Sequence, residues 1–253
     1  MRHHLHKFSQ AFALVGAIVP LRLHAQAHEG AHWAYKGKEG PSHWGALDSA
    51  YALCARGKAQ SPINIVPTAP HQLPGLSIAY QPTAINILNN GHTIQVNADP
   101  GCACVLAGKK YELLQFHFHH PSEHLLAGKP FDLECHFVHR SAAGDLAVVG
   151  VFIKPGAPNM ALQPLFDAMP AKATPETKAA GTVDTAALLP KSGSYFRYMG
   201  SLTTPPCSEG LTWTVFKEPI EASPEQIRQF ASLFSNNARP VQGRNRRFLI
   251  ESN

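Results

Sequence analysis

The stretch Gln115-Phe116-His117-Phe118-His119 decides both the expected fold and the expected site. Side chains of a β-strand alternate between two faces, so His117 and His119 project from one face and the two phenylalanines from the other. A second strand-like run, Phe131–His139, follows a turn signal at residues 127–130. If the two runs pair antiparallel about that turn, His119 faces His136, and three imidazoles converge.

Three histidines with no fourth protein ligand nearby in sequence indicate a catalytic Zn²⁺ site, because structural zinc sites have four protein ligands. Gln115 lies two residues before His117, and Glu134 lies two residues before His136. Each therefore shares the strand face of its histidine and is expected to accept a hydrogen bond from the outer ring nitrogen. Such partners fix the orientation and the tautomer of a metal-binding imidazole.

The first 27 residues are typical of a secretory signal peptide that is cleaved. They combine a basic start, an apolar run at Phe8–Val19 and an A-x-A cleavage site at Ala25-Gln26-Ala27. The apolar run is too short to span a bilayer comfortably, so a membrane anchor or a core helix is the weaker interpretation. We expect a single domain over residues 28–253, a periplasmic or secreted location, and no stable membrane anchor after cleavage.

The charge balance gives no case for a nucleic-acid partner. The chain of 253 residues has a formal charge of +5. The leader carries three basic residues and no acidic one, so its removal leaves +2. Four arginines near the C-terminus are interpreted as a solvated or salt-bridged surface rather than an anion-binding patch: Arg239, Arg244, Arg246 and Arg247.

The five cysteines are compatible with a disulfide in an exported protein, and their odd number leaves at least one thiol free. Cys54 and Cys207 both lie in loop-like sequence and are the better candidates for a pair. The residues alone leave other pairings open.

Strand patterns dominate the rest of the chain and predict a mainly β (α+β) domain. Asn90-Gly91 is a strong hairpin signal between two short apolar runs. Residues 146–153 form a nearly continuous apolar run, which is typical of a strand buried on both faces. Helices are expected to be few; the best signal is Ser223 as a cap, followed by Pro224 and by Gln226.

Several motifs in the same order resemble the α-class carbonic anhydrases. They are Ser61-Pro62-Ile63-Asn64, Asn90-Gly91-His92, Gln115–His119, Ser122-Glu123-His124, Glu134–His139, Ser201–Pro206 and Leu211-Thr212-Trp213. The resemblance implies a large, twisted, mostly antiparallel central sheet with short peripheral helices. It also implies reversible hydration of CO2 to bicarbonate and a proton, with sulfonamides and anions as inhibitors. A homodimer is possible.

The resemblance also implies roles for individual residues. A zinc-bound hydroxide attacks CO2, and the pKa of its parent water, about 7, is the value known for carbonic anhydrases rather than one obtained from this sequence. Thr203 accepts a hydrogen bond from that hydroxide and donates to Glu123, while His92 shuttles the proton to solvent. The CO2 pocket matches Val138, Val148, Leu202, Thr204, Leu211 and Trp213, and the water network matches Tyr35, Asn90 and Gln95. The family pattern also pairs Cys54 with Cys207.

Two departures from the family pattern stand out. His120-Pro121 replaces a Trp-Gly pair common in the animal enzymes, and His120 should point away from the ligand face. Gln95 stands where many members carry asparagine. Two rival functions are also compatible with the sequence: a non-catalytic, carbonic-anhydrase-like binding module, and a zinc hydrolase acting on small esters.

Overall fold

The computed structural model describes residues 30–73 and 75–253. The expected signal peptide therefore lies outside the described residues. Residues Ala31–Asn253 form one compact unit. Most of its regular structure is strand, so the mainly β fold class is confirmed. No helix in the described part of the chain is long and apolar enough to cross a membrane.

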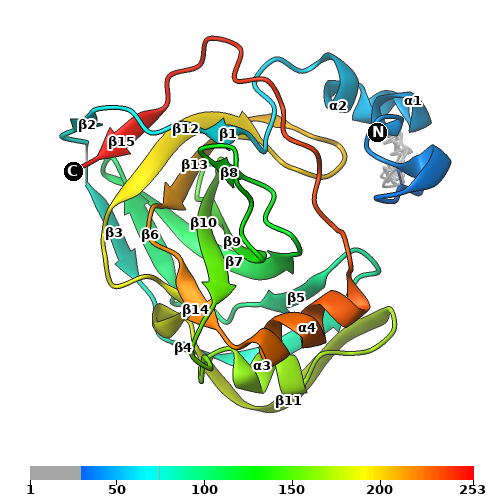
Figure 1. Ribbon diagram of the computed structural model, residues 1–253, viewed down its shortest axis with the longest axis vertical. Coiled ribbons are helices and arrows are strands. Elements are labelled where there is room, and N and C mark those ends of the chain that lie inside the picture. Colours follow the sequence, from blue (N-terminus) through cyan, green and yellow to red (C-terminus); the bar gives the residue numbers. More distant parts are fainter. Residues whose placement is uncertain (1–29, 74) are drawn as a thin grey trace, which may run out of the picture. The chain divides into compact units, whose positions relative to one another are not determined.

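Thirteen strands join in one large sheet (Figure 1). Its main path runs β11-β4-β5-β7-β9-β10-β13-β12-β15-β2, with β14 beside β10, and with β3 paired to β6 and β6 to β7. Neighbours are antiparallel except at β10–β13, β10–β14 and β15–β2. The remaining two strands, β1 and β8, form a separate parallel pair. The strands are β1 Asn64–Ile65, β2 Pro70–His71, β3 Leu76–Ala79, β4 Pro82–Asn89, β5 Ile94–Asn97, β6 Ala103–Leu106, β7 Lys109–His119, β8 Leu125–Leu126, β9 Leu133–Ser141, β10 Leu146–Pro155, β11 Thr174–Asp184, β12 Tyr195–Ser201, β13 Glu209–Phe216, β14 Ile220–Ala222 and β15 Ile250–Ser252.

The helices are short and peripheral (Figure 1). The expected start of the longest one is confirmed: Ser223 Oγ accepts from Gln226 N, and the Gln226 side chain accepts from Ser223 N. The helices are α1 Trp44–Leu47, α2 Leu53–Arg56, α3 Gln163–Asp167 and α4 Pro224–Leu233, and the 3-10 turns are η1 Gly37–Glu39, η2 Ser49–Tyr51 and η3 Ala186–Leu188.

The two histidine-bearing strands, β7 and β9, are antiparallel neighbours, but their register differs from the expected one. His117, not His119, faces His136, and His119 faces Glu134. The expectation was wrong by two residues because it assumed a tight hairpin. Instead, the chain between β7 and β9 forms a longer excursion that includes β8. A slip of two residues keeps every side chain on its own face, so the three imidazoles still converge.

The alternation along β7 separates an apolar core from the histidine face. Phe116 and Phe118 are fully buried in the largest hydrophobic cluster. Phe118 packs edge-on against Phe166 of α3 and also contacts Phe230 of α4, with ring centroids 5.7 and 5.9 Å apart. The two helices therefore cover the phenylalanine side of the sheet. The histidines project from the opposite side, which leaves that side available for a cavity.

Candidate active site

Three imidazoles meet on the open face of β7 and β9. The ring centroids of His117 and His119 lie 5.0 Å apart, and that of His136 lies 5.4 and 4.5 Å from them. One ring nitrogen from each falls within 4.8 Å of the others, close enough to share a metal ion. The structure therefore brings together the three histidines predicted from the sequence.

The outer nitrogen of each ring is held by an acceptor oxygen. His117 Nδ1 donates to Gln115 Oε1 at 2.8 Å, and His136 Nε2 donates to Glu134 Oε1 at 2.9 Å, as predicted. The partner of His119 Nδ1 is the backbone oxygen of Asn237, at 2.8 Å. Sequence reasoning missed this third partner, because a backbone carbonyl 118 positions away leaves no local signal.

These hydrogen bonds determine which nitrogens face the cavity. An oxygen acceptor requires a proton on the outer nitrogen, so His117 Nε2, His119 Nε2 and His136 Nδ1 carry the inward lone pairs. His119 Nε2 is buried and has no hydrogen-bond partner among the described residues. Burial lowers the pKa of both His117 and His119, which keeps these rings neutral. Burial acts to lower the pKa of His136 as well, but the Glu134 and Glu123 carboxylates raise it above its usual value. Three pre-oriented imidazole nitrogens are the ligand set of a catalytic zinc ion.

Glu134 is itself anchored by a second histidine. His124 donates from its backbone nitrogen to Glu134 Oε2 at 2.8 Å and from Nδ1 to Oε1 at 2.7 Å. Burial alone would raise the pKa of Glu134, but His124 and His136 hold it well below its usual value. His124 Nε2 accepts from the Tyr198 hydroxyl at 2.6 Å. Both ring nitrogens of His124 are thus occupied, so this histidine is a support for Glu134 and not a ligand.

A cavity of about 120 Å³ opens beside the histidines. Five of the predicted cavity residues line it with His117 and His119: Tyr35, Asn90, His92, Gln95 and Thr204. The His92 ring stacks on Trp33 with centroids 3.7 Å apart and planes 9° apart. This contact was not expected from the sequence, and it fixes the imidazole at the cavity wall.

The Glu123 carboxylate lies next to two of the three converging histidines. Its Oε2 lies 3.6 Å from His119 Nε2 and 3.8 Å from His136 Nδ1, and it has no hydrogen-bond partner among the described residues. Its Oε1 accepts from the backbone nitrogen of Arg239 at 2.8 Å. Thr203 is buried in the loop between β12 and β13. The expected Thr203–Glu123 hydrogen bond is not formed in this structure and stays a prediction.

The predicted apolar pocket residues form one cluster next to His136. Val148, Leu211 and Trp213 are buried in it, and Val138 and Leu202 pack against it. Strand register explains the grouping, because Val148 on β10 pairs with Val138 on one side and with Trp213 on the other. The Trp213 ring lies 4.8 Å from the His136 ring, centroid to centroid.

The Cys54–Cys207 disulfide is formed, as the family pattern implied. It ties the loop that carries Thr203 and Thr204 to α2. Arg239 lies beneath it: its guanidinium donates to Cys54 O at 3.0 Å, to Ser61 O at 2.8 Å and to Gln60 Oε1 at 2.9 Å. The expectation that Arg239 belongs to a solvated surface was therefore wrong.

Fold and site together define a class: a mainly β protein with three converging histidines that suit a single metal ion. The sequence profile described as "Eukaryotic-type carbonic anhydrase" matches residues 39–252. The chain belongs to this family, the α-carbonic anhydrases, whose enzymes hydrate CO2 reversibly.

Similar proteins agree with this assignment. The chain is 48% identical over 229 residues to a carbonic anhydrase of Nostoc sp., covering 87% of this chain and 86% of the relative. It is 45% identical over 227 residues to one of Pectobacterium carotovorum, covering 89% and 93%. The α-carbonic anhydrase of Thermovibrio ammonificans, solved with the inhibitor sulfanilamide, superposes with a TM-score of 0.85 at 44% identity, covering 87% of this chain and 99% of that one.

Proposed function

We propose that this chain hydrates CO2 reversibly with a Zn²⁺ ion held by His117, His119 and His136. The observation that carries the proposal is the set of three inward nitrogens, each fixed by an acceptor on the far side of its ring. Bound zinc supplies a Lewis acid that makes water a nucleophile at neutral pH. Neutral ligands suit this chemistry, because thiolate or carboxylate ligands would donate charge and weaken it.

The apolar cluster beside His136 would receive the substrate. CO2 has no net charge and no dipole, so an apolar wall holds it without competing for the polar groups of the site. Val138, Leu202 and Trp213 provide such a wall. Thr203 and Glu123 would orient the attacking oxygen, with the Thr203 hydroxyl accepting a hydrogen bond from it and donating one to Glu123 Oε2. The unpartnered state of that carboxylate oxygen supports this assignment.

His92 would carry the released proton from the cavity to solvent. Its imidazole lines the same cavity as His117 and His119 and is half-buried on Trp33. Burial, reinforced by the neighbouring His32, lowers the pKa of His92, so the ring is neutral and able to accept a proton at neutral pH. Tyr35, Asn90 and Gln95 would hold the intervening waters.

One experiment separates this function from its two rivals. CO2 hydration and hydrolysis of a small ester are measured on one sample before zinc removal, after chelation, and after zinc is restored. We expect both activities to vanish and return with zinc, with CO2 hydration far the faster. Faster ester turnover would instead support a zinc esterase. A zinc-loaded protein that turns over neither substrate would be a binding module.

We further propose that the protein is periplasmic or secreted. The signal-peptide pattern of residues 1–27 supports this, and so does the Cys54–Cys207 disulfide, since disulfides persist in oxidising compartments. Fractionation of the source cells tests it: the processed chain should be found outside the cytoplasm, and an unprocessed cytoplasmic chain would contradict the assignment.

A further inference from the structure

One buried residue, Asn237, contacts both a metal-binding histidine and the histidine proposed to carry the proton. Asn237 lies in the segment at residues 235–239, which follows α4 (Figure 1), and it is 1% exposed. Its backbone oxygen accepts from His119 Nδ1 at 2.8 Å. Any residue could supply that oxygen, so the backbone contact alone does not explain an asparagine at this position.

The Asn237 side chain uses its acceptor and both of its donors. Oδ1 accepts from His120 N at 2.8 Å, and Nδ2 donates to His92 O and to Phe118 O, both at 3.0 Å. The backbone nitrogen of Asn237 donates to His120 O at 3.1 Å. An amide side chain offers an acceptor beside two N–H donors, whereas an aspartate of the same shape would face the two carbonyl oxygens with no N–H to donate. These contacts therefore explain why the residue is an asparagine.

These hydrogen bonds fix two functional histidines at once. His119 lies between Phe118 and His120, so Asn237 binds the backbone on both sides of this histidine as well as its ring. Asn237 also holds the backbone oxygen of His92, whose ring lines the histidine cavity. A displacement of Asn237 would therefore move both a ring nitrogen that faces the proposed zinc ion and the imidazole that would carry the proton.

The segment around Asn237 is itself anchored on both sides. Before it, Ser235 O accepts from His120 Nδ1 at 3.0 Å. After it, the guanidinium of Arg239 donates to Ser61 O at 2.8 Å. The backbone nitrogen of Arg239 also donates to Glu123 Oε1 at 2.8 Å, so the same segment positions the carboxylate beside the converging histidines. Asn237 is thus the middle of a fixed segment and not part of a free loop.

We propose that Asn237 is a positioning residue that couples zinc binding at His119 to proton transfer through His92. The inference rests on the proposed function, because that function supplies both the zinc site and the proton path. Asn237 acts through the ring of one histidine and the backbone of the other. Loss of its side chain should therefore weaken both functions, although all three proposed ligands and the proton carrier remain in the chain.

The variant Asn237→Ala removes the side-chain hydrogen bonds and keeps the backbone oxygen. Zinc affinity is measured by competition with a chelator, at a temperature well below the melting point of the variant. We expect about tenfold weaker zinc binding, because partners that orient metal ligands contribute on this scale. At saturating zinc, CO2 hydration in weak buffer should be about tenfold slower, and added imidazole should restore it by replacing the displaced His92.

The double variant His92→Ala, Asn237→Ala separates the two effects. If Asn237 acts on proton transfer through His92, its loss should not slow the weak-buffer rate of His92→Ala any further. Zinc affinity should still fall about tenfold, because that effect passes through His119. A further fall of the weak-buffer rate in the double variant would contradict the assigned route.

Asn159→Ala is the matched control for the lost hydrogen bonds. The Asn159 side chain also binds backbone atoms only: Oδ1 accepts from Ala161 N and Leu162 N at 3.0 and 3.2 Å, and Nδ2 donates to Glu221 O at 3.0 Å. This control should lose stability and keep the zinc affinity and the weak-buffer rate of the parent chain. The comparison separates a positioning role from a merely structural one.

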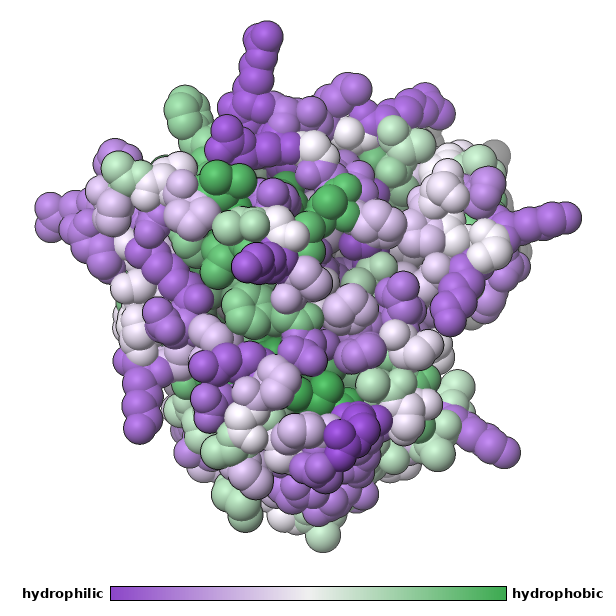
Figure 2. All heavy atoms as spheres, viewed as in Figure 1, coloured by the Kyte–Doolittle hydropathy of each residue, from purple (hydrophilic) through white to green (hydrophobic). Residues whose placement is uncertain are grey.

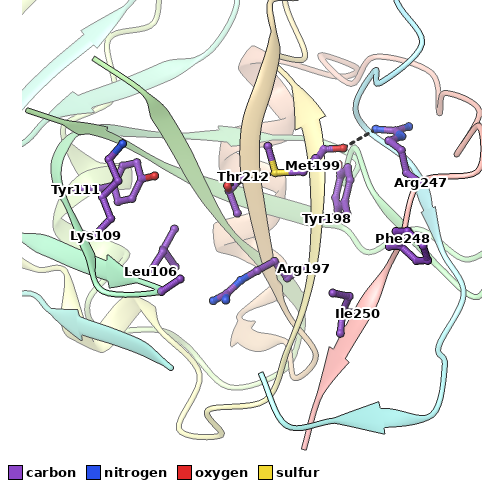
Figure 3. A pocket seen from close by; sticks show the side chains of 11 residues that line it. Leu106, Lys109, Tyr111, Arg197, Tyr198, Met199, Thr212, Arg247, Phe248 and Ile250 are labelled. Carbon is purple, nitrogen blue, oxygen red and sulfur yellow. Dashed lines mark hydrogen bonds between the residues drawn. The ribbon is translucent and has the colours of Figure 1, made fainter. Parts of the chain in front are cut away.

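A second control lies in a groove of about 670 Å³ that shares no lining residue with the histidine cavity. Figure 2 shows hydrophobic side chains gathered on the face that β6 and β12 present in Figure 1. Figure 3 shows Phe248 and Ile250 on one side of this groove and Leu106 on the other. Because Phe248 is 87% exposed, Phe248→Ala should fold normally and leave both zinc affinity and turnover unchanged.

Amide hydrogen exchange on the unsubstituted chain provides a test that needs no variant and no turnover. The amides of Asn237 and His120 are bonded to His120 O and Asn237 Oδ1. Adding zinc to the metal-free protein should slow the exchange of both amides, because the metal fixes His119 between them. The Ala161 amide, which Asn159 holds, should exchange at the same rate with and without zinc.

The outcomes that would overturn the inference are distinct. Parent-like zinc affinity in Asn237→Ala, with only a loss of stability, would make Asn237 a structural residue. Loss of zinc affinity without a slower weak-buffer rate would remove the coupling to His92. Exchange at Asn237 and His120 that ignores zinc would exclude the contact as a route to the metal. A parent chain that binds no zinc would instead refute the proposed function, and this inference with it.

Discussion

Replacing both Cys54 and Cys207 with serine tests how the fold supports the proposed catalytic loop. The bridge closes a loop of 153 residues. Chain entropy for a closed loop of this length predicts a loss of about 5 kcal/mol in the free energy of unfolding at 25 °C. For a domain of this size that corresponds to a melting temperature lower by about 10–20 °C.

The same change should also affect turnover. Cys207 N donates to Thr204 O at 2.8 Å, so the bridge ends inside the turn that carries Thr203 and Thr204. Without the covalent tie, the Arg239 guanidinium still donates to Cys54 O at 3.0 Å on the α2 side, whereas Cys207 O accepts from a neutral donor, Gln60 Nε2, at 3.0 Å. We therefore expect slower CO2 hydration together with the loss of stability.

Urea denaturation and thermal melting of the zinc-loaded protein provide the assay. The parent chain should lose stability on addition of a reductant, and the double serine variant should not respond to it. The three remaining cysteines are buried thiols and act as an internal control. A reduced parent chain with unchanged melting temperature and unchanged CO2 hydration would refute the reasoning.

Three other changes test separate parts of the account. His92→Ala should slow CO2 hydration in weak buffer by about tenfold or more, and added imidazole should restore it; a rate indifferent to buffer would exclude His92 as the proton carrier. Burial lowers the pKa of His139 from 6.5 to about 4. As the pH falls below 6.5, this histidine therefore takes up a proton in the unfolded chain before it does so in the folded chain. The free energy of unfolding should consequently fall by about 3 kcal/mol between pH 6.5 and pH 4. His139→Gln should flatten that fall in urea titrations, and an equally steep fall in the variant would contradict the assignment. Arg239→Met should cost about 3–5 kcal/mol by stranding its buried acceptors, whereas Arg228→Met on the surface of α4 should leave the urea midpoint nearly unchanged; equal effects would show that burial of Arg239 is energetically unimportant.

The strand alternation was the most informative part of the sequence. It placed Gln115 and Glu134 beside their histidines because a period of two is a local property of any strand. It could not give the register of β7 against β9, since that depends on the path of the chain between them. The role of Asn237 could not be predicted from the sequence for a related reason: Asn237 contributes a backbone oxygen to the site, which any residue could supply.

Other failures have physical causes of their own. Strand β11 was not expected, because it is an exposed sheet neighbour of β4 and lacks the alternating apolar pattern of a half-buried strand. Arg239 was grouped with a surface cluster by charge alone. Its guanidinium is held by three oxygen acceptors that lie 178 to 185 positions earlier in the chain, on Ser61, Gln60 and Cys54. Composition and spacing contain no trace of such contacts.

The central claim is that His117, His119 and His136 hold the zinc ion on which CO2 hydration depends. Stopped-flow CO2 hydration and zinc content, measured together on the parent chain and on His119→Ala, test it most directly. We expect one zinc ion per parent chain with rapid hydration, and loss of both in the variant. A variant that keeps a full complement of zinc and hydrates CO2 at the parent rate would contradict it.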